Sequence, residues 1–447
     1  MKLLIARRLA LAASLLWAAL YALPACALVI GMNPPAPPLS AERIAALPAA
    51  ERGAWSDYLA AAQRQKQADQ AALMAERRAV QTEQTAQAVP PPPASGHGEA
   101  SMPLNKSAAW YAGPEALQVA DNIVSYQTPA GGWGKNQPRD QAPRLPGQAY
   151  VAGNASKFEV AGDFDQPLDA AWSYVGTIDN DATLTEIRFL ARVQAQLQPA
   201  QAAPYRSSAL KGIRYLLAAQ FPNGGWPQVW PLQGGYHDAI TLNDNAMAGV
   251  AELLGQVARG DDGFGFVPDE LKAAAAAAEQ RAIGNLLALQ VRVQGRLMLW
   301  GQQHDALTLM PVSARNYEPP ALCTSESAEI LLYLMSLQQP TPQVVAAVDA
   351  GVAALRALEM QGLSWGKLAG ENVRGLHRKP LARFLWARYH DLKTLQPVFG
   401  DRDKSLHDDV TEISAERRNG YAWFVTTPKK ALLAYDDWLQ QPGHKAR

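Results

Sequence analysis

The chain has 447 residues, of which 48% are hydrophobic, and this is enough for one large domain with a sizeable core plus smaller appendages. Lys plus Arg and Asp plus Glu are each 41, so the formal net charge is zero. Because nucleic-acid-binding proteins normally carry a basic excess, this balance argues against that class, and any affinity for a polyanion must come from a local cluster of cations.

Residues 1–27 have the parts of an export signal. Lys2, Arg7 and Arg8 supply the positive start, residues 9–23 are apolar and uncharged, and small residues precede the expected cleavage point. The pattern predicts a signal peptide over 1–27 and a mature protein that is secreted or periplasmic.

Two alternatives to simple cleavage stay open. Residues 23–26 loosely resemble a lipoprotein box, so Cys26 could carry a lipid anchor, and the apolar run up to Ile30 is almost long enough for a retained anchor. No later segment is apolar enough to span a membrane. Cys323 is the only other cysteine, so the sequence predicts no internal disulfide and a stability that depends on the core.

Residues 28–89 are predicted to form a helical segment in front of the main domain. The part from 40 to 86 is rich in Ala, Gln and Arg and has few large apolar residues such as Trp55, so we expect one or two loosely packed helices. Residues 90–104 begin with four prolines and continue with Ala-Ser-Gly-His-Gly, which predicts a linker that is first stiff and then flexible. The main domain is expected over 105–447.

Helix-compatible segments dominate the main domain, with apolar residues at i, i+3 and i+4, and the sequence has no long alternating run of β-branched residues. We therefore expect an all-α domain. The predicted helical segments are 168–173, 180–196, 206–220, 243–258, 268–290, 325–338, 342–358 and 428–440.

A short motif repeats after predicted helices. Gln127-Thr-Pro-Ala-Gly-Gly-Trp133 recurs as Gln220-Phe-Pro-Asn-Gly-Gly-Trp226, and a degraded third copy is predicted at Gln361-Gly-Leu-Ser-Trp365. The motif predicts a helix that stops, turns through Pro and Gly, and buries a Trp, which is typical of helical hairpins closed into an α/α toroid. We interpret the tryptophans as buried supports of the repeat.

Two clusters of acids and amides stand at predicted helix starts. Asp179, Asn180 and Asp181 precede one apolar helix, and Asn243-Asp244-Asn245 precede another. One helix cap explains one such residue but not three, and carboxylate and amide oxygens are ligands that Ca²⁺ takes. Two such starts that face one cleft could hold one cation between them.

Two arginines lie in polar loops that suit an acidic ligand. Arg315 lies in a Pro-bounded loop, where it could serve a cleft or simply pair with Glu318. Arg402 precedes a basic and aromatic stretch at 416–423, and a guanidinium binds a carboxylate with two hydrogen bonds, although its acidic neighbours could also neutralise it. His304 stands beside an Asp, but no nucleophilic Ser lies in an elbow motif, so we expect a structural histidine.

Together these stretches resemble polysaccharide lyase family 10, the pectate lyases with an (α/α)3 toroid. They occur in order across nearly all of 105–440, and the chain departs from the usual pattern only at flanking positions, with Gly134, Asp181 and Gly301. The matching stretches are GGWGKN at 131–136, TIDNDATLTEIRFLARV at 177–193, NGGWPQVWPL at 223–232, ITLNDNAM at 240–247, WGQQHDALTLMPVSARNYEPP at 300–320, DRDKSL at 401–406 and EISAERRNGYAWF at 412–424.

The resemblance implies a monomeric, calcium-dependent pectate lyase that acts on polygalacturonate. It implies Arg315 as the base that removes the C5 proton of galacturonate. The residues implied around Ca²⁺ are Asp179, Asn180 and Asp244. The residues implied in substrate binding are Arg402, Lys135, Asn136, Asn243 and Tyr317.

The implied chemistry is β-elimination. A calcium ion on the substrate carboxylate would neutralise the charge that develops when the C5 proton leaves, and the departing C4 oxygen then leaves a 4,5-unsaturated end. Arginine normally stays protonated, so a base role for Arg315 requires surroundings that favour the neutral form. A strongly alkaline optimum is therefore expected.

Three other functions stay open from the sequence. An inverting glycoside hydrolase on a helical toroid would use Asp179 and Asp244 as its acid and base. Gly-Gly-Trp repeats also occur in terpene cyclases, although Asp179 and Asp181 in a polar context fit a carbocation site poorly. A non-catalytic carbohydrate-binding toroid would need no base.

Overall fold

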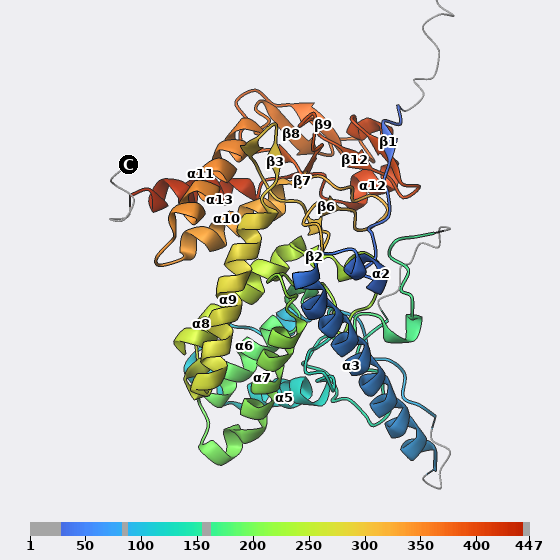
Figure 1. The fold of residues 1–447 in the computed structure, drawn as a ribbon, viewed down its shortest axis with the longest axis vertical. Helices are drawn as coiled ribbons and strands as arrows, with labels where there is room; N and C mark the ends of the chain where they lie inside the picture. Colours follow the sequence, from blue (N-terminus) through green and yellow to red (C-terminus); the bar gives the residue numbers. More distant parts are fainter. Residues whose placement is uncertain (1–27, 83–87, 154–161, 441–447) are drawn as a thin grey trace, which may run out of the picture.

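The structure is a computed structural model, and it describes residues 28–82, 88–153 and 162–440 (Figure 1). The predicted signal peptide over 1–27, with Cys26, lies outside the described residues. Within the part of the chain that the structure describes, no helix is both long enough and apolar enough to cross a membrane.

Helices form the main body of the molecule. They are α2 (Ala41–Ala45), α3 (Ala49–Thr82), α4 (Ala108–Tyr111), α5 (Pro114–Ser125), α6 (Leu184–Gln194), α7 (Pro199–Ala219), α8 (Ala246–Arg259), α9 (Asp269–Leu289), α10 (Thr324–Ser336), α11 (Pro342–Ala357), α12 (Ala415–Gly420) and α13 (Pro428–Trp438). Helices α6 and α7, α8 and α9, and α10 with α11 and α13 pack side by side, and α5 packs on both α6 and α7 (Figure 1). The predicted all-α toroid of helical hairpins, (α/α)3, is confirmed.

The helix bounds differ from the predicted ones where special backbone chemistry intervenes. Helix α7 begins earlier than predicted, at Pro199, because proline fits the first position of a helix, where no N–H is needed. Helices α6 and α8 begin later than predicted, because the acids and amides before them form separate 3₁₀ turns. The segment predicted at 168–173 holds only the short 3₁₀ turn Ala170–Trp172.

The strands are two to four residues long and pair only in small antiparallel sheets. They are β1 (Gly31–Met32), β2 (Ile240–Thr241), β3 (Arg292–Val293), β4 (Arg296–Leu297), β5 (Gln303–His304), β6 (Pro311–Val312), β7 (Leu322–Cys323), β8 (Leu363–Gly366), β9 (Gly375–Arg378), β10 (Trp386–Ala387), β11 (Tyr389–His390), β12 (Phe399–Gly400), β13 (Ser405–His407) and β14 (Phe424–Val425). Two sheets have three strands, in the orders β1-β13-β12 and β2-β5-β6. These two sheets flank the loops that carry Arg402 and Arg315.

Four buried tryptophans close the ends of four helices. The indole N–H of each donates to a backbone carbonyl in or just before the last turn of the helix that precedes it, at 2.7 Å in every case. The pairs are Trp133 with Ile123, Trp226 with Leu216, Trp300 with Leu286, and Trp386 with Leu355. Carbonyls at a helix end lack a partner within the helix, so each indole satisfies one of them. The predicted role of the repeat tryptophans as buried supports is confirmed.

The glutamine of the repeat joins neighbouring helices. Gln127 donates to the carbonyl of Ser208 on α7, and Gln220 donates to that of Ala278 on α9. Gln290 donates in the same way to the carbonyl of Ala347 on α11. Helices α5, α7, α9 and α11 are therefore connected in series by equivalent side-chain hydrogen bonds.

The predicted third copy of the repeat, at 361–365, is wrong. The structural equivalent begins at Gln290 and ends at Trp300, and the β3–β4 hairpin lies between them. This insertion removes the Gly-Gly pair and changes the spacing, so the sequence pattern is lost while the contacts are kept. Trp365 is only half-buried and packs against Phe424 instead.

The N-terminal helices pack closely, contrary to the loose packing that was predicted. Trp55 of α3 is 3% exposed and its ring lies 5.3 Å from that of Phe221. Tyr58 donates to the carbonyl of Ala219 at the end of α7, and Glu76 pairs with Arg144 at 2.6 Å. A few aromatic residues at helical spacing are thus enough to attach α3 along the body (Figure 1).

The segment predicted as a linker also contacts the body. Gly96 donates its backbone N–H to the carbonyl of Asn136, and Pro91 accepts a hydrogen bond from Gln148. Met102 is buried at 3% exposure. The described residues of 90–104 therefore form part of the wall of the molecule, whereas the domain boundaries themselves stay predictions.

The hydrogen bonds from the buried indoles to helix ends predict that removing one of them lowers stability more than removing an indole that caps no helix. Trp226→Phe leaves the carbonyl of Leu216 buried and unpaired, which should lower the free energy of unfolding by about 1–3 kcal/mol beyond the loss of packing. Chemical denaturation of the variant and the parent measures the difference. Trp365→Phe is the matched control and should have a smaller effect, because that indole caps no helix; equal losses would contradict the closure.

Candidate active site

Two matching turns precede α6 and α8, and they contain the predicted metal ligands. The turns are the 3₁₀ segments Asp179–Asp181 and Asn243–Asn245, and they lie in contact. Their central residues, Asn180 and Asp244, have φ values of 51° and 49°, a left-handed region that Asn and Asp enter more readily than most residues. The two turns therefore bring the oxygen-bearing side chains of Asp179, Asn180, Asn243 and Asp244 to one place.

The side chains of the first turn are not needed to cap α6, because residues that follow the turn cap this helix. Thr183 and Glu186 form a reciprocal capping box at the start of α6, with the Thr183 N–H donating to Glu186 at 2.8 Å. Glu186 also pairs with Arg139 at 2.8 Å, and both side chains are almost fully buried. Arg139 in turn donates to the carbonyl of Gly134, next to Lys135. This cluster joins the Lys135 loop to the Asp179 turn.

Asp179 forms a buried ion pair with Lys135. The Nζ of Lys135 donates to one carboxylate oxygen of Asp179, and the Nδ2 of Asn243 lies 3.3 Å from the other. Burial alone would raise the pKa of Asp179, but the Lys135 ammonium outweighs it and the pKa falls below its usual range. The pKa of Lys135 rises in turn, because the attraction of Asp179 outweighs burial. Asp179 is thus ionised at any ordinary pH.

Asp244 lies in the opposite electrostatic situation. Burial, and then the negative charges of Asp179 and Glu326, raise the pKa of Asp244 to about 6. Asn243 donates to its carboxylate at 2.8 Å. Two neighbouring carboxylates that repel each other are a natural place for a cation, which would favour both ionised forms. No cluster of three His, Cys, Asp or Glu side chains suited to a metal occurs among the described residues, so amide or substrate oxygens would have to complete the coordination.

A chain of side chains connects these turns with the predicted base. Gln302 donates to the Oδ1 of Asn243 at 2.7 Å and to Glu318 at 3.3 Å. Glu318 then holds Arg315. All three bridging side chains are buried. The predicted cation side and the predicted base are therefore the two ends of one polar network.

Arg315 and Glu318 form a two-point ion pair. The Nε and Nη2 of Arg315 donate to the two carboxylate oxygens at 2.9 and 2.6 Å, and the backbone N–H of Arg315 donates to the same carboxylate. The Arg315 side chain is 37% exposed, whereas Glu318 is 2% exposed. The carboxylate overcomes the effect of burial and raises the pKa of Arg315, and the guanidinium lowers the pKa of Glu318 to about 2. The pairing with Glu318 that was considered from the sequence is present, and it favours the protonated form of Arg315, whereas a base role requires the neutral form.

Tyr317 lies beneath three guanidinium groups. Those of Arg417, Arg315 and Arg402 stand 4.4, 5.2 and 5.5 Å from its ring centre. Arg402 and Arg417 share the carboxylate of Glu416. Tyr317 itself is only 5% exposed, which makes it a support for the arginines. Its predicted direct contact with substrate stays a prediction.

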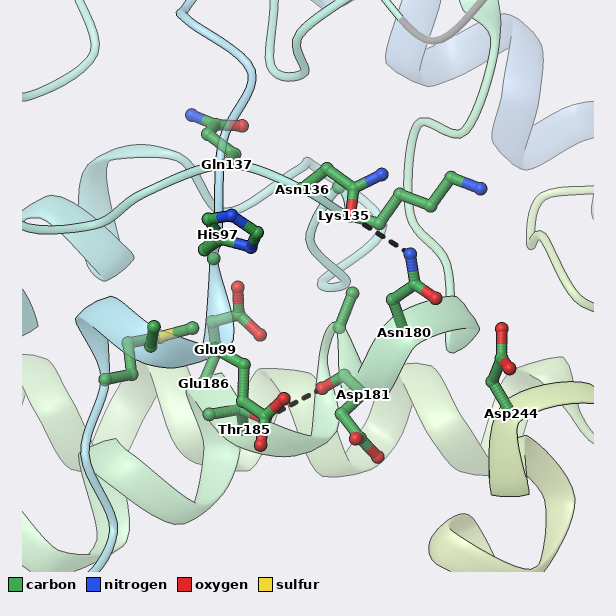
Figure 2. A pocket seen from close by; sticks show the side chains of 15 residues that line it. His97, Glu99, Lys135, Asn136, Gln137, Asn180, Asp181, Thr185, Glu186 and Asp244 are labelled. Carbon is green, nitrogen blue, oxygen red and sulfur yellow. Dashed lines mark hydrogen bonds between the residues drawn. The ribbon is translucent and has the colours of Figure 1, made fainter. Parts of the chain in front are cut away.

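Two adjoining cavities contain most of the predicted site. The smaller, of about 120 Å³, is lined by Lys135, Asp179, Asn180, Asn243, Asp244 and Arg315. The larger, of about 410 Å³, shares Lys135, Asn180 and Asp244 with it and adds Asn136 (Figure 2). Arg402 and Tyr317 line neither cavity. The structure thus brings seven of the nine predicted site residues together.

Several lining residues were not predicted from the sequence. Figure 2 shows His97 and Glu99, from the segment expected to be a linker, on the side of the larger cavity opposite Asp244. Burial and the charge of Glu99 raise the pKa of Asp181 in this cavity. Gln302 was also missed, since a glutamine in a polar loop has no distinctive pattern. These residues lie far apart in sequence, and only the fold brings them together.

His304 is the structural histidine that was expected. Its Nδ1 donates to the carbonyl of Leu309 at 2.8 Å, its Nε2 accepts the N–H of Gly301 at 2.9 Å, and it is fully buried. Both ring nitrogens are thus used within the scaffold. Burial lowers its pKa to about 4, so it stays neutral.

Comparison with known families agrees with this geometry. Residues 127–432 match the family model described as pectic acid lyase. This match covers more than half of the chain. The chain belongs to the pectic acid lyase family. It is accordingly a polysaccharide lyase, and the terpene-cyclase alternative is excluded.

Solved structures of this kind are similar over the same region. A family 10 polysaccharide lyase from Cellvibrio cellulosa has 29% sequence identity and a TM-score of 0.62, with 77% of this chain and 98% of that chain covered. An aspartate-to-alanine mutant of the Cellvibrio cellulosa enzyme, in complex with trigalacturonic acid, has 28% identity and a TM-score of 0.62, with coverage of 76% and 98%. No curated protein matched the chain. The resemblance to polysaccharide lyase family 10 is confirmed.

The buried ion pair between Arg139 and Glu186 predicts that removing its carboxylate strongly destabilises this lyase. Glu186→Gln leaves the Arg139 guanidinium buried without its carboxylate, which should lower the free energy of unfolding by about 3–5 kcal/mol. Glu252→Gln is the control, because Glu252 is 52% exposed and lies 3.7 Å from Arg188, and it should change stability by less than about 1 kcal/mol. Denaturant unfolding of both variants measures this, and similar losses would show that Arg139 does not depend on Glu186.

Proposed function

We propose that this protein is a pectate lyase that cleaves α-1,4-linked polygalacturonate by calcium-assisted β-elimination and gives 4,5-unsaturated oligogalacturonides. We further propose that it works as a monomer, secreted or periplasmic after removal of its signal. Family membership supports the reaction class, and the neighbouring Cellvibrio enzyme in complex with trigalacturonic acid supports the substrate class.

One observation carries the proposal. A strong cationic side chain, Arg315, and an oxygen-rich cluster around Asp179 and Asp244 line the same small cavity. Elimination next to a carboxylate needs a base, which Arg315 would be in its neutral form, and a cation held by the oxygen cluster that stabilises the charge developing on the carboxylate. The sugar carboxylate would lie toward the oxygen cluster and the C5 hydrogen toward Arg315.

The oxygen donors fit a calcium ion that the substrate helps to coordinate. Asp179 and Asp244 supply carboxylates, and Asn180 supplies an amide oxygen, all hard ligands of the kind Ca²⁺ prefers. Burial, and then the negative charges of Asp179 and Glu326, raise the pKa of Asp244, so a cation bound here would favour its ionised form. When bound there, the ion would act as a Lewis acid on the substrate carboxylate. Lys135, already paired with Asp179, would hold that carboxylate in place from the protein side.

Arg315 is proposed as the base in its neutral form. The C5–H bond breaks as the proton moves to a guanidine nitrogen, the C4–C5 double bond forms, and the C4–O bond breaks as the leaving oxygen takes up a proton from water. Because Glu318 favours the protonated guanidinium, the neutral fraction grows only as the pH rises. Activity should therefore increase steeply toward alkaline pH.

The arginines around Tyr317 are proposed to bind a second sugar carboxylate. The guanidinium groups of Arg402 and Arg417 both bind the carboxylate of Glu416. A guanidinium that already has a planar carboxylate partner can exchange it for a substrate carboxylate of the same geometry. Asn136 and Asn243 are proposed to bind sugar hydroxyls or carboxylates from the cavity side.

One observation favours a hydrolytic alternative. The pKa of Asp179 is lowered while that of Asp244 is raised to about 6, and carboxylates with divergent pKa values are typical of acid–base pairs in glycosidases. Lys135 blocks one oxygen of Asp179, which speaks against free access of water to it. The product separates the two functions, because hydrolysis yields no double bond.

The proposed function predicts a calcium-dependent product that absorbs ultraviolet light. Polygalacturonate incubated with the protein and Ca²⁺ at alkaline pH should give unsaturated uronides, and a chelator should abolish them. Arg315→Lys should lower kcat by at least about 10²-fold, because a positioned base contributes that much. Arg214→Lys on the exposed side of α7 should leave kcat unchanged.

New reducing ends without ultraviolet absorption would support the hydrolase instead. Retained turnover in Arg315→Lys would mean that another residue is the base. Binding of polygalacturonate without any turnover by the parent protein would support a carbohydrate-binding role.

The Glu318 pair predicts a shift in pH dependence. Glu318→Gln removes the carboxylate that raises the pKa of Arg315, so that pKa falls and the rising alkaline limb of kcat/KM should move to lower pH. Tyr421→Phe is the control, since it removes a 2.7 Å hydrogen bond to Glu318 without removing its charge, and its limb should move less. An unmoved limb in Glu318→Gln, with activity retained, would exclude Arg315 as the titrating base.

A further inference from the structure

The stretch that follows the predicted signal lies against both arginine loops of the site. We call residues 28–34 the N-terminal arm. Its strand β1 pairs antiparallel with β13, and backbone hydrogen bonds run from Ile30 to Leu406 and from Asn33 to Lys404 at 2.8 and 2.7 Å. Figure 1 shows β1 beside β12 and α12, from the opposite end of the sequence. The arm therefore completes a sheet next to the Arg402 loop.

Asn33 continues the arm into the turn that carries Arg315. Its Nδ2 lies 3.2, 2.9 and 3.2 Å from the backbone carbonyls of Arg315, Asn316 and Glu318. Asn33 is 3% exposed, so these contacts are shielded from water. Three carbonyls around one group require an N–H donor there, and a carboxylate in the same place would be repelled.

Neighbouring contacts fix the same turn from other sides. Ser313 donates its hydroxyl to the carbonyl of Pro34, the next residue of the arm. The side chain of Asn316 accepts the N–H of Phe164 at 2.9 Å and donates to the carbonyl of Arg402 at 2.9 Å. The side chains of Asn33 and Asn316 thus connect the N-terminal arm, the Arg315 turn and the Arg402 loop through hydrogen bonds to backbone carbonyls.

We propose that Asn33 is a positioning residue for Arg315, and that the N-terminal arm is a working part of the active site. The matched family region begins only at residue 127, so the arm lies outside it. Arg315 is partly exposed and its side chain is held by one carboxylate, so its place in the cavity depends on the backbone of its own turn. Asn33 fixes that backbone, and a small displacement of a base strongly reduces the rate of proton transfer. This inference rests on the proposed lyase function.

The test compares two buried asparagines. Asn33→Asp and the milder Asn33→Ser remove the donor that faces the three carbonyls. Each should lower kcat on polygalacturonate by about 10- to 100-fold while KM changes by less than about threefold, because the base moves but the sugar-binding groups stay. Asn285→Asp is the control. Asn285 is also 3% exposed and donates to a backbone carbonyl, that of Asn223 at 3.1 Å, on α9.

The measurements are kcat, KM and the thermal unfolding temperature of each protein at one alkaline pH with Ca²⁺. The control should lose thermal stability but keep kcat, whereas Asn33→Ser should lose kcat even where it stays folded. Full kcat in folded Asn33 variants would overturn the positioning role while leaving the lyase function intact. A parent protein that forms no unsaturated product would overturn the lyase function and this inference with it.

Discussion

The ion pair between Arg315 and Glu318 is the contact on which the site depends. Glu318 is buried, and it also accepts hydrogen bonds from Tyr421 and from Gln302, which leads through Asn243 to the Asp179 turn. A charge placed near Asp179 should therefore change the electrostatic potential at Arg315, because the polar side chains that connect them are buried. The same carboxylate that orients the guanidinium opposes its loss of a proton. For the proposed base role, the placement and the basicity of Arg315 are thus in conflict, and we expect activity to require alkaline pH.

The scaffold around this ion pair repeats one arrangement of side-chain hydrogen bonds at the ends of its helices. A buried indole donates to a carbonyl at a helix end, and a glutamine joins that helix to a neighbouring one, as Trp226 and Gln220 do for α7 and α9. The Asp179 and Asn243 turns, which follow the Trp133 and Trp226 units, line the small cavity, and Thr183 and Glu186 provide the capping of α6. Acids and amides in the two turns are left available for ligands. The ring of hairpins therefore supplies rigidity, while the irregular loops between them supply the chemistry.

Much of this site could be predicted from the sequence, because its oxygen-bearing residues occur twice in equivalent positions. Asp179 and Asp244 stood out as more polar than a helix start requires, and Arg315 stood out in its Pro-bounded loop. The parts that could not be predicted depend on tertiary contact. The Arg315–Glu318 pair is local and could be considered from the sequence, but its two-point geometry could not. Asn33 was missed because it contacts a turn 283 residues away in the sequence, and the third repeat was missed because a hairpin interrupts the pattern.

The central claim is that the glycosidic bond is broken by elimination at this cavity, without addition of water. It is tested most directly by digesting polygalacturonate in water labelled with heavy oxygen and weighing the products by mass spectrometry. Elimination predicts unsaturated products that carry no label from the cleavage step. Incorporation of one labelled oxygen for each bond broken, in products without a double bond, would contradict the account and point to a hydrolase using Asp179 and Asp244.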